Sequence, residues 1–223
     1  MKIIMFFIAL VLSGVVNAQT VKFNIDGTLQ KNKTAKFAYL VSNGAVLGKG
    51  DLFLVRPLDG NSFHFSGTSN LEGKLLRTAF IFLDERGDIT LSQVREKIER
   101  KIWFVSGSAN LKTIYLEDIK LDIENPYNLA PAKIISGGTY LQQSKDAMQA
   151  MRERKFLEFV KKNSDSPVAL DEVSKMVSFV GLKNLAAVDF GSPNEMYTAL
   201  SDRLKTTKQG IELKKKLDQN KMK

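Results

Sequence analysis

The pattern of apolar and polar positions changes twice along this chain, and the first change falls within its first twenty residues. Residues 3–16 are almost entirely apolar, follow the basic Lys2, and precede the small residues of Val16-Asn17-Ala18. A basic start, a short apolar stretch and a small-residue cleavage site are typical of a secretory signal peptide, and the stretch is too short for a membrane span. We therefore expect residues 1–18 to be removed near Ala18 and the protein to be periplasmic or secreted.

The second region, from residue 21 to about residue 135, alternates apolar and polar positions in short runs that end at turn residues. This period of two is typical of β-strands. The runs that predict strands are residues 21–25, 36–41, 52–55, 62–66, 76–83, 101–105 and 111–123, with a further run starting at residues 88–91. Asp26-Gly27, Asp59-Gly60 and Gly67 are expected to end or turn three of them. The pattern predicts an antiparallel β-sandwich-like domain over residues 19–136.

Beyond Pro126, Pro131 and Gly137-Gly138 the period becomes helical, which predicts a second domain over residues 137–223. One long helix is expected from an apolar face that consists of Leu141, Met148, Met151, Phe156, Phe159 and Val160. Another is expected to start at Ser166-Pro167 and close at Gly181, a third to start at the capping box Ser192–Glu195, and a lysine-rich one to carry Ile211, Leu213 and Leu217. The predicted fold class is α+β, with a small helical bundle of about four helices after the strands.

Composition and charge restrict the chemistry. The chain has no cysteine and one histidine, which excludes thiolate chemistry and leaves too few ligands for a structural zinc site. The net charge of +9 favours anionic partners, and export makes nucleic acid the least expected of these. Residues 201–223 hold eight Lys or Arg against three Asp or Glu. These lysines are expected to form a solvated helix face, with weak contact to an anionic surface as the alternative.

The single histidine is the first candidate for catalysis. His64 lies between Phe63 and Phe65, and strand alternation points it away from both, toward solvent or a neighbouring strand. A Ser-His-Asp hydrolase needs such a histidine, but the sequence has no G-x-S-x-G motif. Gly48-Lys49-Gly50-Asp51 lacks the spacing of a phosphate-binding loop and predicts a hairpin. Trp103 is expected to pack in the core rather than to form a sugar platform.

Two groups of carboxylates are the candidates for calcium binding. They are Asp84, Glu85 and Asp88 in one turn, and Glu117, Asp118, Asp122 and Glu124 near a strand end. Neither group matches the D-x-[DN]-x-[DN]-G loop, so solvated turn and edge carboxylates are expected. The sequence thus assigns no catalytic, cofactor-binding or metal-ligating residue, and no cofactor is expected.

Several segments, taken in order, resemble one known family. They are residues 23–29, 37–40, 59–67 (D-G-N-S-F-H-F-S-G), 82–89, 105–110 and 156–167. In this order they resemble domain of unknown function 4369 (DUF4369), which typically forms the N-terminal region of exported TlpA-like and AhpC/TSA-like thiol-disulfide oxidoreductases of Gram-negative bacteria. In that family a thioredoxin-like domain with a C-x-x-C pair follows the helices. This sequence ends at Lys223 without a cysteine, so no redox residue is carried over.

Three functional hypotheses follow. The first is an exported, non-catalytic binding or interaction module whose partner is a protein, a glycan or the envelope surface. The alternative is an accessory subunit of a separate periplasmic thioredoxin-domain oxidoreductase that docks through the C-terminal helices. The third is a hydrolase whose paired carboxylates come from distant segments.

Overall fold

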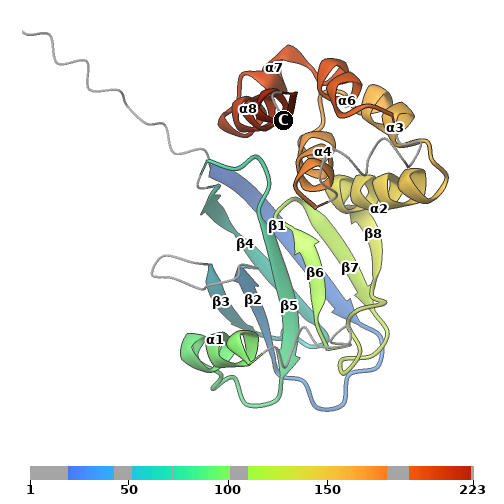
Figure 1. Ribbon diagram of the computed structural model, residues 1–223. Helices are drawn as coiled ribbons and strands as arrows, with labels where there is room; N and C mark the ends of the chain where they lie inside the picture. The colour runs from blue at the N-terminus through green and yellow to red at the C-terminus, as the bar shows by residue number, and fades with distance from the viewer. Residues whose placement is uncertain (1–19, 43–51, 72, 101–109, 180–190, 222–223) are drawn as a thin grey trace, which may run out of the picture.

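The computed structural model describes residues 20–42, 52–71, 73–100, 110–179 and 191–221. Two four-stranded sheets formed by residues 20–137 are followed by a set of short helices that pack together at one end of the sheets (Figure 1). The predicted α+β fold class is confirmed. The predicted signal peptide, the Gly48–Asp51 hairpin, the 101–105 strand with Trp103 and the Gly181 helix end lie outside the described residues.

The first sheet has the strand order β4-β1-β7-β8. Its strands are β4 (Ser62–Asn70), β1 (Thr20–Leu29), β7 (Ile119–Ile123) and β8 (Lys133–Gly137). The β1–β4 and β7–β8 pairs are antiparallel, but β1 and β7 run parallel, which departs from the all-antiparallel prediction. Parallel neighbours need a long crossover, and here the chain between β1 and β7 forms β4 and the whole second sheet.

The second sheet has the order β3-β2-β5-β6 and is antiparallel throughout. Its strands are β3 (Phe53–Pro57), β2 (Phe37–Ser42), β5 (Thr78–Asp84) and β6 (Lys112–Tyr115). Alternate residues of both sheets meet in one buried core that includes Phe23, Ile25, Leu40, Phe63, Phe65, Ile81, Ile114 and Leu121. The two sheets therefore pack face to face.

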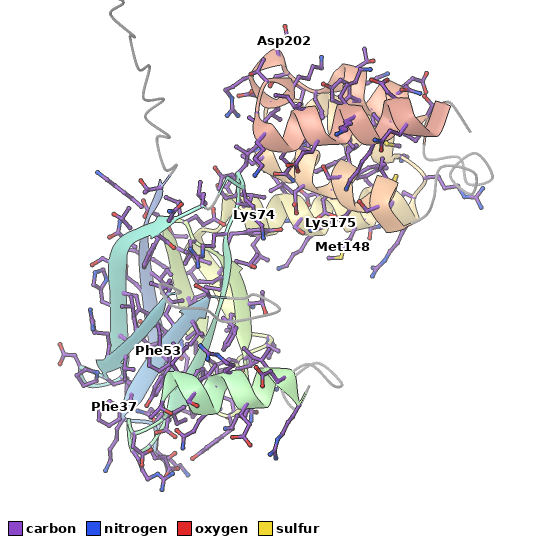
Figure 2. All side chains as sticks on the ribbon, turned by 60° about the vertical axis from the view of Figure 1, so that its left-hand side comes forward. Phe37, Phe53, Lys74, Met148, Lys175 and Asp202 are labelled. Atoms are coloured by element: carbon purple, nitrogen blue, oxygen red, sulfur yellow. The ribbon has the colours of Figure 1, made fainter. Side chains whose placement is uncertain are left out.

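The other face of the second sheet is also buried, because helix α1 (Leu91–Glu99) covers it. Val94 and Ile98 of this helix pack with Tyr39 and Phe80, and Figure 2 shows Phe37 and Phe53 on the same side. The prediction of a strand starting at residues 88–91 is wrong. Thr90 and Gln93 form a capping box, a T-x-x-Q start signal that begins a helix at Leu91.

Two predicted strand ends are wrong for a shared reason. β1 continues through Gly27 and β4 continues through Gly67. In the β1–β4 register Gly27 lies opposite Phe63, and Gly67 lies opposite Phe23. A Cβ on Gly27 would lie 2.1 Å from the Phe63 ring, so the ring fills the place of the missing side chain. At each glycine, an aromatic ring from the neighbouring strand packs where a side chain would lie. Both glycines therefore lie within long strands and do not form turns.

The predicted run at residues 111–123 divides into β6 and β7, which belong to different sheets. Strand β8 was not predicted, because Pro131 and Gly137-Gly138 on either side of it were interpreted as breakers between domains. The structure uses them to frame a short edge strand, since Gly137 adopts a positive φ of 71° where β8 ends.

The helices are α2 (Thr139–Arg152), α3 (Phe156–Lys162), α4 (Pro167–Phe179), α6 (Pro193–Ala199), α7 (Asp202–Lys205) and α8 (Lys208–Lys221). The single long helix predicted across residues 141–160 is wrong, because Arg154 has a φ of 60° and separates α2 from α3. The predicted starts at Pro167 and at the Ser192 capping box are confirmed. Within the described residues, none of the helices has both the length and the apolar character needed to cross a membrane.

The helical half has a buried core of its own and is joined to the strands by side chains. Phe156, Val173 and Leu204 belong to this core, and Leu75 and Leu76 from the segment between β4 and β5 pack against it. Lys74, in the same segment, lines a cavity of about 360 Å³ between that segment and helices α4 and α8 (Figure 2). The core of the helical half is thus in contact with the segment that joins β4 to β5.

Candidate functional site

A cavity of about 880 Å³ opens at the end of the sheets that lies away from the helical half (Figure 1). Its walls come from two segments, residues 30–33 after β1 and residues 122–133 at the end of β7 and the start of β8. Because β1 and β7 run parallel, their ends bring these segments to one edge of the first sheet. We call this cavity the loop pocket.

Tyr127 is the exposed aromatic ring of the loop pocket. Its backbone N–H donates to Oδ1 of Asn125 over 2.9 Å, which closes a tight turn. Its hydroxyl contacts the hydroxyl of Thr34 and donates to Oε1 of Glu85 over 3.1 Å. The residue nevertheless remains 56% exposed. The residue is therefore held at its backbone and at its hydroxyl while more than half of its surface stays open to solvent.

A buried lysine holds the wall of the loop pocket from inside. Lys112 of β6 is 8% exposed, and its Nζ donates to the carbonyl oxygens of Ala130 and Ala132 over 2.9 and 2.6 Å. Burial, with a smaller contribution from nearby Lys145, lowers the pKa of Lys112 below its ordinary value. Two hydrogen bonds from one ammonium thus fix the loop that carries Tyr127.

Most carboxylates in the loop pocket are engaged, whereas two lysines are not. Gln30 donates to Asp122 over 2.6 Å, and Lys31 lies 3.9 Å from Glu124. Lys33 and Lys133 form no ion pair with any residue that the structure describes. Three lysines, Lys31, Lys33 and Lys133, therefore face two carboxylates in this pocket, and its net charge is positive.

A second cavity, of about 510 Å³, lies on the open face of the same sheet, and we call it the sheet-face pocket. His64 lines it, with Nδ1 2.7 Å from Oδ1 of its cross-strand neighbour Asp26. The expected orientation of His64 is confirmed, because Phe63 and Phe65 are buried on the opposite face. Ser62 lines the same pocket, and the hydrolase hypothesis stays a prediction.

The first predicted carboxylate group stabilises a turn. Oδ2 of Asp84 accepts the backbone N–H groups of Arg86 and Gly87 over 2.8 and 2.7 Å. Asp88 lies 3.5 Å from Arg86, and Glu85 accepts the Tyr127 hydroxyl. These carboxylates hold the turn after β5 and, through Glu85, the ring in the loop pocket.

The second carboxylate group is spread over three roles. Glu117 accepts the backbone N–H of Tyr140, Asp118 accepts the Asn24 amide over 2.9 Å, and Asp122 and Glu124 belong to the loop pocket. Across the described residues, no three His, Cys, Asp or Glu side chains are placed together to hold a metal ion.

Comparisons of the chain with protein-family models, curated proteins and solved structures found no match. The resemblance to DUF4369 therefore stays a prediction. Sequence reasoning did not single out Tyr127, Lys33, Lys133 or Lys112. One signal was available for the tyrosine, since an aromatic residue inside N-P-Y-N sits between turn-forming residues that favour an exposed loop. No local signal marks Lys112, because its partners are 18 and 20 positions away.

Proposed function

We propose that this protein is an exported, non-catalytic binding module that holds a polar ligand in the loop pocket. The observation that carries the proposal is the Tyr127 ring, fixed at its backbone and hydroxyl yet 56% exposed within a cavity of about 880 Å³. A volume of this order suits a small-molecule site, and a fixed ring binds with little loss of conformational freedom.

The placement of the pocket supports the same proposal. Binding residues commonly lie on loops that a rigid scaffold positions. Here the scaffold is the paired sheets, and Lys112 ties the loop at residues 130–132 to strand β6. The carboxylates of Asp122 and Glu124 are engaged by Gln30 and Lys31. This leaves cations and amides, which are groups for holding a ligand.

The accessory-subunit hypothesis predicts an apolar patch on the C-terminal helices. The exposed large apolar residues of the described chain are Tyr127, Ile135, Met148 and Ile211. Two of them, Met148 on α2 and Ile211 on α8, lie in the helical half (Figure 2 shows Met148). Single exposed apolar side chains are ordinary on protein surfaces, so the loop pocket supports binding more strongly.

A thermal-shift screen of the mature protein tests the proposal. Small molecules, peptides and saccharides are added one at a time, because a ligand of the folded state raises the unfolding temperature. We expect at least one probe to stabilise the wild type. Tyr127→Phe keeps the ring but loses the hydroxyl contacts that hold it, so we expect it to be stabilised less. Tyr127→Ala, which lacks the ring, is expected not to be stabilised. Met148→Ala serves as the control for loss of an exposed side chain elsewhere.

The screen has two contradicting outcomes. No stabilisation by any probe would overturn the proposal. Stabilisation that Tyr127→Ala retains in full and Met148→Ala loses would move binding to the helices and favour the accessory role.

A further inference from the structure

The loop pocket, at the end of the first sheet, adjoins the sheet-face pocket on the open face of that sheet. On β7 the loop pocket uses Asp122 and the sheet-face pocket uses Lys120, and on β8 they use Lys133 and Ile135. Residues two positions apart along a strand point to the same face, about 7 Å from each other. The two pockets are therefore neighbours along the strands, and together they suit an elongated ligand.

Most of the charged side chains that line these two pockets without an ion-pair partner are positive. Lys33 and Lys133 in the loop pocket, and Lys120 and Arg56 in the sheet-face pocket, form no ion pair within the described part of the chain. One carboxylate, Asp59 of the sheet-face pocket, also has no ion pair there. Asp26 contacts His64, and Glu124 lies 3.9 Å from Lys31. Asp122 accepts the neutral amide of Gln30 and keeps its negative charge. An elongated ligand with regularly placed anionic groups would meet these lysines.

The Tyr127 ring adds a second requirement. This exposed aromatic side chain is flat and largely apolar, and Gln30, Asn125 and Asn128, which carry side-chain amides, line the same pocket. A pyranose ring has the matching surface, with an apolar face of C–H groups and a rim of hydroxyls that hydrogen-bond to amides. An acidic peptide or a polyphosphate would satisfy the lysines without using the ring.

We infer that this face binds an acidic oligosaccharide. One sugar ring packs on Tyr127, and the carboxylates of the oligosaccharide contact Lys33, Lys133 and Lys120. The inference rests on the proposed function and adds the ligand class. It gives the open face of the first sheet, which is not covered by any helix among the described residues, a role as the continuation of the loop pocket.

Calorimetric titration of the mature protein with three probes tests it. The probes are trigalacturonate, the neutral cellotriose, and hexaglutamate as an anion without sugar rings. We expect trigalacturonate to bind about tenfold more tightly than either control, which corresponds to about 1.4 kcal/mol, and to weaken as salt is raised.

Variants locate the binding. Tyr127→Ala is expected to weaken trigalacturonate binding about tenfold. Tyr127→Phe keeps the ring but loses the hydroxyl contacts, and is expected to weaken binding by a smaller factor. Lys33→Gln combined with Lys133→Gln is expected to weaken it about fivefold. The matched control, Lys161→Gln with Lys162→Gln, removes two lysine charges from helix α3 and is expected to leave the affinity unchanged.

Each result that differs from these expectations overturns a specific part of the inference. Equal binding of hexaglutamate would overturn the saccharide, and equal binding of cellotriose would overturn the acidic groups. If trigalacturonate fails while another probe stabilises the wild type through Tyr127, the inference is wrong and the proposed function stands. If no probe of any kind binds, both are wrong.

Discussion

Both carboxylate oxygens of Glu117 lie 3.2 Å from the backbone nitrogen of Tyr140, and this contact joins the strands to the helical half. Helix α2 begins after Gly138, which has no side chain to cap it. The carboxylate from the turn between β6 and β7 supplies the missing acceptor at the positive end of the helix. The packing of Tyr115 against Tyr140, with ring centroids 6.2 Å apart, lies beside this contact.

The Glu117 contact predicts a pH dependence of stability. Burial raises the pKa of Glu117 above its ordinary 4.5, although hydrogen bonds from the start of α2 partly oppose this. A raised folded-state pKa means that the contribution is fully present below pH 4.5 and is lost as pH rises through the folded value. We expect the free energy of unfolding, measured in urea, to contain this decline in the wild type and not in Glu117→Gln.

Glu212→Gln, a change at an exposed residue of α8, is the control and is expected to follow the wild type. A constant difference between wild type and Glu117→Gln across the acid range would contradict the prediction.

Because the Phe63 ring packs directly on Gly27, we predict that a single methyl group added at Gly27 strongly lowers the free energy of unfolding. A Cβ at Gly27 would overlap the Phe63 ring, whereas one at Gly67 would lie 3.2 Å from the Phe23 ring. We expect Gly27→Ala to lower the free energy of unfolding by about 2–3 kcal/mol and Gly67→Ala to cost clearly less. Chemical denaturation measures both.

A double-mutant cycle isolates the cause of that cost. In a Phe63→Ala background the overlap disappears, so Gly27→Ala is expected to cost less there than in the wild type. Equal costs in the two backgrounds would show that backbone conformation, rather than the ring, selects glycine at this position.

The two hydrogen bonds that Lys112 donates predict a local effect at the loop pocket. Lys112→Met leaves the carbonyls of Ala130 and Ala132 without their donor, at a cost of about 1–3 kcal/mol. We expect faster amide hydrogen exchange in residues 125–132 and weaker binding of any ligand of the loop pocket. Lys22→Met, an exposed change on β1, is expected to alter neither. Unchanged amide exchange in residues 125–132 would contradict the claim that Lys112 holds this loop.

The start of helix α1 gives a simpler test. The Thr90 hydroxyl accepts the Gln93 N–H over 3.3 Å and completes the capping box. Thr90→Ala is expected to lower stability by about 1 kcal/mol, with Thr90→Ser close to wild type. Thermal unfolding of the two variants measures this difference. An equal loss of stability in Thr90→Ala and Thr90→Ser would show that the hydroxyl does not cap the helix.

Sequence periodicity predicted the fold class because the core is built from regular alternation. Ile25, Phe63 and Phe65 face inward where the alternation places them, and the Ser192 capping box starts a helix. Local reasoning failed where the deciding partner is distant in sequence. The partner that explains Gly27, Phe63, is 36 positions away, so local sequence predicts a turn there. The short run at residues 88–91 predicts a strand when it is considered without the capping box of Thr90 and Gln93.

The candidate site was less predictable than the fold. The loop pocket exists because β1 and β7 lie side by side in parallel, a pairing that no single segment encodes. The Tyr127 hydroxyl is held by Thr34 and Glu85, and Lys112 ties the loop to strand β6, and all of these partners are distant in sequence. The sequence showed the turn residues but not the contacts that make the turn a site.

Mapping of backbone amide shifts by nuclear magnetic resonance tests the central claim most directly. Trigalacturonate and every ligand from the thermal-shift screen are titrated into the labelled mature protein. The account predicts shifts concentrated in residues 30–34 and 125–133, with those of the acidic saccharide extending to Lys120 and His64, and their loss in Tyr127→Ala. Shifts confined to the helical half, or an unperturbed loop pocket with every ligand, would contradict it.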